Sequence, residues 1–127
     1  MPTPHKITLP DGSWVNLRSK QRRFKAGERR ALYELFDKLE GGEAVKTLTL
    51  VRHMAAHLIE DWSLDLPRPQ AELKNGQVLY ENMESLDEID CAMEDEILAY
   101  AGEWLKQISI NLNPSREANS PTEPSGA

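Results

Sequence analysis

Apolar and polar residues alternate near the start of the chain in a way that is typical of two short strands. Apolar residues stand at every second position on either side of an Asp-Gly turn: Ile7, Leu9, Val15 and Leu17. The pattern predicts an N-terminal β-hairpin over about residues 7–17 with one buried side. Because two strands alone are marginally stable in water, we expect this hairpin to pack on helices, with Trp14 as its anchor.

Helical spacing follows in two segments. Over residues 28–39 the apolar stripe consists of Leu32, Leu35, Phe36 and Leu39, and it ends before a Gly-Gly pair. Over residues 43–62 the stripe steps by four or three residues through Ala44, Leu48, Val51, Ala55, Leu58 and Trp62. Both patterns predict amphipathic helices that face a core. Pro67 and Pro69 then exclude a continuous helix.

A third helix is predicted over residues 85–108. Ser85 and Glu88 have the spacing of an N-terminal capping box. Its main apolar stripe comprises Leu86, Ile89, Met93, Ile97, Tyr100, Trp104 and Ile108. A second, narrower strip comprises Leu98, Ala101 and Leu105. This strip either forms part of a partner-binding groove or packs against the hairpin.

Two further segments complete the predicted architecture. Asn75-Gly76 is a good type I′ turn signal, so residues 70–82 form either a second hairpin or an irregular loop. Residues 111–127 are rich in Asn, Ser and Pro, and we expect a disordered tail. We therefore predict a mainly α fold in which a β-hairpin packs on a bundle of about three helices, forming one domain over residues 1–110.

Charge is distributed unevenly along the chain. Residues 1–30 carry eight Lys and Arg against two acids, whereas residues 81–103 carry nine acids and no Lys or Arg. We expect these segments to attract each other, within one chain or between copies, and to promote self-association. We expect four arginines of the basic segment to form a protein-docking surface: Arg22, Arg23, Arg29 and Arg30. A net charge of −6 disfavours nucleic acid as the main partner.

Candidate chemistry is sparse. His53, His57 and Asp61 follow one another at intervals of four, but the apolar stripe lies on the other side, so we expect solvent-exposed side chains and no metal site. The single cysteine, Cys91, excludes an intrachain disulfide and a cysteine zinc cluster, and we expect an inert thiol that is at least partly buried. Phosphate-binding, dinucleotide-binding, nucleophile-elbow and calcium-loop motifs are absent from the sequence. We expect a non-enzyme without catalytic residues, metal or cofactor.

Membrane and export signals are also absent from the sequence. No apolar run approaches the ~20 residues that a transmembrane helix needs. The first residues contain no apolar segment of the kind that secretory signals have. These features predict a cytoplasmic protein that does not associate with membranes.

Three stretches together resemble a known family: ITLPDGSWVNLR at 7–18, DWSLDLPRP at 61–69 and MESLDEIDCAMEDEIL at 83–98. In this order they are similar to the tail assembly chaperones encoded by actinobacterial siphophages and prophages. The resemblance covers most of residues 7–105. The insert AELKNGQVLYENM, between the second and third stretches, departs from the family pattern.

The resemblance implies a non-catalytic chaperone in the host cytoplasm. Such a protein binds the phage tape measure protein and keeps it soluble until tail tube subunits assemble around it, and it is expected to be absent from the mature virion. Two alternatives remain open: a minor structural protein of the virion at the head–tail junction, and a small nucleic-acid-binding regulator that uses residues 18–30.

Overall fold

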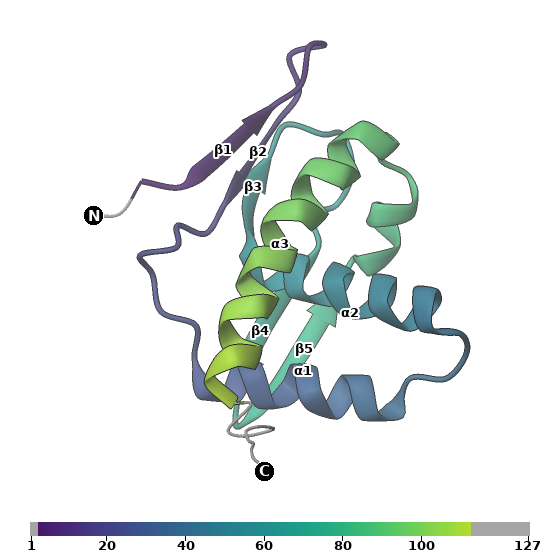
Figure 1. Cartoon of the computed structure of the whole chain (residues 1–127). Helices are drawn as coiled ribbons and strands as arrows, with labels where there is room; N and C mark the ends of the chain where they lie inside the picture. The colour runs from purple at the N-terminus through teal and green to yellow at the C-terminus, as the bar shows by residue number, and fades with distance from the viewer. Residues whose placement is uncertain (1–2, 113–127) are drawn as a thin grey trace, which may run out of the picture.

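The computed structural model describes residues 3–112, with side chains as far as Ile108, and contains three helices and two antiparallel sheets (Figure 1). The helices are α1 (Ala26–Lys38), α2 (Glu43–Leu58) and α3 (Cys91–Leu112), and a 3-10 turn, η1 (Met83–Asp87), precedes α3. The strands are β1 (His5–Thr8), β2 (Trp14–Leu17), β3 (Ile59–Trp62), β4 (Gln70–Lys74) and β5 (Gln77–Glu81). Three helices were predicted, but strands make up more of the fold than one N-terminal hairpin.

The N-terminal hairpin is confirmed, and it belongs to a three-stranded sheet with the order β1-β2-β3. Val15 of β2 pairs with Ile7 of β1 on one side and with Trp62 of β3 on the other. The helix predicted over residues 43–62 is therefore wrong for its last four residues. The helical spacing of Leu58 and Trp62 was misleading, because Ile59–Trp62 supplies the hydrogen bonds that the free edge of β2 would otherwise lack.

The buried side of the hairpin consists of aliphatic residues. Val15 and Leu17 are fully buried and Ile7 is nearly so. Trp14, the expected anchor, is only half-buried, and the Lys6 ammonium lies 5.4 Å from the centre of its ring. The prediction of Trp14 as anchor was wrong because Trp14 and Val15 point to opposite faces of the strand, and the face with Val15 meets the core.

Only the C-terminal half of α2 reaches the core. Ala55 and Leu58 are buried as predicted, and Met54 joins them. Ala44 and Leu48, which the same stripe placed inside, are exposed. The first turns of α2 thus lie outside the core although their apolar spacing continues.

Of the two alternatives left open for residues 70–82, the structure shows the hairpin. β4 and β5 pair through a two-residue turn in which Asn75 and Gly76 both have positive φ, 54° and 78°. These angles are those of a type I′ turn, in which the twist of the turn matches that of the strands. The hairpin packs with β4 against α2 and with β5 against α1.

Helix α3 begins six residues later than predicted. Ser85 and Glu88 belong to η1 and its end, and Asp90 caps α3 by accepting a hydrogen bond of 2.8 Å from the Ala92 N–H. Burial of Ser85 and Leu86 holds η1 against the core, so the predicted capping box was wrong. The predicted main stripe is otherwise largely confirmed: Leu86, Met93, Ile97, Tyr100, Trp104 and Ile108 are buried.

The C-terminal part of the chain was predicted to be disordered from residue 111. The helix continues as far as Leu112. The rest of the predicted tail lies outside the described residues.

Candidate protein-binding face

Apolar side chains from all three helices surround a pocket of about 200 Å³. Its lining consists of Leu32, Tyr33, Phe36, Leu50, Leu105 and Ile108. Tyr33 stands at the rim, with 40% of its surface exposed. Pockets for small ligands measure about 300–1,000 Å³, so this pocket is smaller than those and has room for one or two apolar side chains.

The predicted apolar strip on α3 is divided by the fold. Ala101 is fully buried and belongs to the core, whereas Leu98 is half-buried. Leu105 lines the apolar pocket beside α1 and α2. The apolar pattern of α3 did not indicate the other walls of this pocket. Leu32 and Phe36 belong to the apolar stripe predicted to face the core from residues 28–39. Spacing within one helix does not indicate which other helix packs opposite it.

Three of the four selected arginines line one basic pocket. Arg22, Arg23 and Arg29 lie with Lys20 around a hollow of about 330 Å³ beside the N-terminal turn of α1 and the C-terminal half of α3. Arg30 lies elsewhere: its guanidinium donates to the Gly76 carbonyl and approaches Glu34 at 3.9 Å. Ile108 lines both the basic and the apolar pocket, so the two are neighbours.

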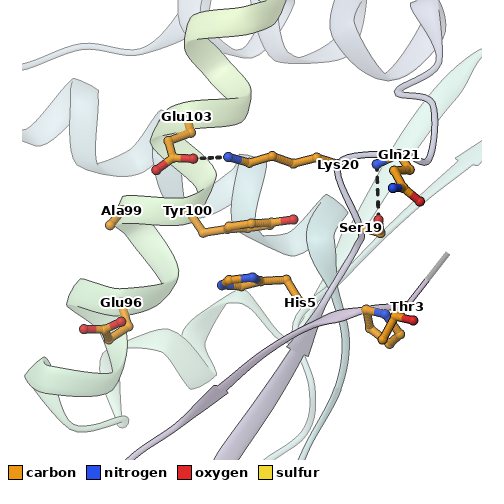
Figure 2. A pocket seen from close by; sticks show the side chains of 10 residues that line it. Thr3, His5, Ser19, Lys20, Gln21, Glu96, Ala99, Tyr100 and Glu103 are labelled. Atoms are coloured by element: carbon orange, nitrogen blue, oxygen red, sulfur yellow. Dashed lines mark hydrogen bonds and ion pairs between the residues drawn. The ribbon is translucent and has the colours of Figure 1, made fainter.

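A third, polar hollow of about 510 Å³ lies between β1, the segment after β2, and α3. Figure 2 shows the Tyr100 ring held between Lys20 and His5. The His5 and Tyr100 rings stack at 4.3 Å, and the Tyr100 hydroxyl donates a hydrogen bond of 2.6 Å to the Arg18 carbonyl. Lys20 is paired with Glu103. The hydroxyl and the ammonium are thus engaged in holding the N-terminal sheet against α3.

A buried polar network joins α1, α2 and β5. Glu28 of α1 accepts hydrogen bonds from the Arg18 guanidinium at 3.1 and 3.3 Å and from the Lys25 N–H at 3.0 Å. His57 of α2 lies between Glu28 and Tyr80, with Nδ1 2.9 Å from the carboxylate and Nε2 2.9 Å from the phenol oxygen. The network is satisfied when His57 carries its proton on Nδ1 and accepts the Tyr80 O–H at Nε2.

Electrostatics in this network follow from burial and pairing. Burial acts to raise the pKa of Glu28, but hydrogen bonds from His57 and Arg18 outweigh it and lower the pKa from 4.5 to about 2. Burial, followed by the negative charge of Glu28, raises the pKa of Tyr80 to about 12. Glu28 therefore stays ionised and Tyr80 stays neutral at physiological pH, so the network stabilises the fold and offers no free nucleophile.

The expectation that His53 and His57 face solvent was wrong. His57 is 5% exposed and both its ring nitrogens are engaged, because α1 and β5 cover the side of α2 opposite the apolar stripe. His53 is half-buried, and its Nδ1 lies 2.8 Å from the Thr49 carbonyl oxygen. Asp61 is exposed on β3. Within residues 3–112, no cluster of three or more His, Cys, Asp or Glu side chains is placed to hold a metal ion.

Two other expectations concern Cys91 and membranes. Cys91 is exposed at the first position of α3, and the prediction of a partly buried thiol was wrong. No helix in the described part of the chain has both the length and the apolar character needed to cross a membrane.

No protein-family model, curated protein or solved structure matches this chain.

Proposed function

We propose that this chain is a non-catalytic protein that binds an apolar stripe of a partner helix and, following the family resemblance, acts as a tail assembly chaperone for a phage tape measure protein. The apolar pocket between the three helices carries the proposal. Its lining is apolar, it is open at Tyr33, and it is smaller than the usual site for a small ligand. An amphipathic helix binds such a groove by inserting one apolar side chain and laying its neighbours along the rim.

The surface expected on the partner is the apolar stripe that a chaperone has to shield from solvent. A long helical protein that waits for assembly exposes apolar stripes, and exposed stripes of this kind promote aggregation. Binding of the stripe to the apolar pocket would hide it, while the many charged residues on the rest of this chain would keep the complex soluble. The tape measure protein is the partner that the resemblance implies.

The test is co-expression of this chain with the tape measure protein from the same locus. We expect the soluble fraction of the tape measure to rise with the wild-type chain. Leu105→Phe places a larger side chain in the apolar pocket, so it should abolish the gain while leaving the helical circular dichroism signal unchanged. Val45→Phe enlarges a residue that is 61% exposed on α2 and does not line the pocket, and it should behave as wild type.

Two results would count against this function. A tape measure that is equally soluble with and without this chain would remove the chaperone role. Mass-spectrometric detection of the chain at stoichiometric level in purified virions would favour a structural role at the head–tail junction, because a chaperone is left behind after assembly.

A further inference from the structure

The basic pocket has uncompensated positive charge. Its lining includes Lys20, Arg22, Arg23 and Arg29 and no acidic residue. Lys20 is paired with Glu103, and Arg22 is paired with Glu60. Arg23 and Arg29 have no ion-pair partner among the residues that the structure describes. The N-terminal turn of α1 lies in the same wall and adds the partial positive charge of a helix start.

Two aromatic residues line this pocket beside the basic side chains. Phe24 and Trp104 line the pocket with their rings 5.7 Å apart. Trp104 is 4% exposed, and its indole N–H finds no acceptor in the described part of the chain. An anionic partner in this pocket would therefore meet two guanidinium groups, Arg23 and Arg29, that have no ion-pair partner in the described part of the chain.

Acidic residues gather at the opposite end of α3. Glu84, Glu88, Asp90 and Asp95 are exposed around η1 and the first turns of α3, and none of them takes part in an ion pair within the described residues. Their neighbours Asp87 and Glu94 both pair with Arg52, whose guanidinium nitrogens lie 2.7 and 2.6 Å from their carboxylate oxygens. We call Glu84, Glu88, Asp90 and Asp95 the acidic pole.

The acidic pole cannot reach the basic pocket of its own chain. Asp95 and Gln107 stand near the two ends of α3, and at 1.5 Å per residue the helix separates them by about 18 Å. Figure 1 shows the N-terminus of α3 beside the preceding turn and its C-terminus beside the start of α1. Within the described residues, the pair between Lys20 and Glu103 is the only ion pair that joins residues 1–30 to the acids of 81–103.

We propose that the basic pocket binds the acidic pole of a second copy of this chain, so that copies associate head to tail. Charge complementarity carries the proposal, because within the described residues the basic pocket has unpaired positive charge and the acidic pole has unpaired negative charge. The fold keeps the two surfaces apart within one chain. The two surfaces differ, so the contact is heterologous and each copy keeps one free end for a further copy. Because the groups are solvent-exposed, salt weakens the contact.

The test is sedimentation over a range of protein concentrations at about 0.01 M and about 1 M salt, where the Debye length is about 30 Å and about 3 Å. We expect the weight-average mass of the wild-type chain to rise with concentration beyond that of two copies at low salt. At high salt it should remain at the 14.4 kDa of one copy. The pocket variant Arg23→Glu/Arg29→Glu and the pole variant Glu88→Lys/Asp95→Lys should each lose the rise at low salt.

Mixing the two variants tests whether the contact joins the basic pocket of one copy to the acidic pole of another. The pocket variant keeps a working acidic pole, and the pole variant keeps a working basic pocket, so an equimolar mixture should form a complex of one copy of each and grow no further. The matched control, Lys38→Glu/Lys74→Glu, changes net charge as the pocket variant does, but at exposed residues outside the basic pocket, and it should associate as wild type. Circular dichroism checks that each variant keeps its helices.

Three results would overturn the proposal. The first is a wild-type mass of one copy at low salt and all concentrations. The second is association of the pocket variant equal to that of wild type, or a variant mixture that stays at one copy. The third is a wild-type chain that stays monomeric but binds a DNA duplex at low salt through Arg23 and Arg29, which would assign the basic pocket to phosphate groups.

Discussion

Glu28 should be the residue whose charge matters most for the stability of this fold. The substitution Glu28→Gln keeps the shape of the side chain and removes the charge that Arg18 and His57 bind. The pKa of Glu28 falls from 4.5 to about 2 on folding, a difference of about 2.5 units, which corresponds to about 3 kcal/mol of stabilisation at pH 7. We therefore expect Glu28→Gln to lower the free energy of unfolding by about 3 kcal/mol at pH 7.

The pH dependence of this difference follows from the sign of the shift. The folded protein holds Glu28 ionised more strongly than the unfolded chain does, so the stabilisation is complete above about pH 5 and is lost as pH falls through 4.5 toward 2. About half of the difference between wild type and variant should be gone near pH 3.3. Urea unfolding of both proteins, followed by circular dichroism between pH 7 and pH 2.5, measures it.

Glu34→Gln serves as the matched control for Glu28→Gln. Glu34 is an exposed residue of the same helix whose carboxylate lies 3.9 Å from Arg30, and its substitution should cost less than about 0.5 kcal/mol. The reasoning is refuted if Glu28→Gln is within about 0.5 kcal/mol of wild type at pH 7, because breaking a buried pair should cost several times more. It is also refuted if the difference stays constant from pH 5 to pH 2.5.

Three other predictions concern stability and titration. In an alkaline absorbance titration, one of the three tyrosines should ionise near pH 12, and this step should disappear in Tyr80→Phe. The same substitution should lower the free energy of unfolding by about 1–2 kcal/mol, because it removes the hydrogen bond to His57. Asp90→Ala should destabilise the protein by about 0.5–2 kcal/mol in urea unfolding, because Asp90 caps α3, and an unchanged midpoint would place the cap elsewhere. Gly76→Ala should cost about 1 kcal/mol, because Gly76 has a φ of 78°, and a gain in stability would contradict the type I′ turn.

Elements with a strong local signal were predictable from the sequence. The Asn75-Gly76 turn requires positive φ at both positions, and this local requirement indicated the second hairpin as one of two alternatives. Alternation around Val15 likewise located the first hairpin. Both signals depend on residues that are neighbours in sequence, so they can be read without knowing the tertiary contacts.

Features that depend on distant partners were not predictable in this way. Ile59–Trp62 forms a strand only because β2 lies beside it, and the local spacing favoured helix. His57 is buried because Glu28 and Tyr80, 29 and 23 positions away in sequence, cover it. The apolar pocket and the basic pocket both need α1 and α3 together. Helical spacing therefore indicated Leu105 and the basic run indicated three of the arginines, but neither pattern revealed a hollow.

The central claim, that the apolar pocket binds a partner helix, is tested most directly by methyl NMR with a purified helical segment of the tape measure protein. Titration of that segment into a chain with labelled Leu and Ile methyl groups should shift the signals of Leu32, Leu50, Leu105 and Ile108, which line the pocket. The exposed Leu48 and Leu79 should shift little. Shifts confined to Leu48 and Leu79, or no shift at saturating segment, would contradict the account.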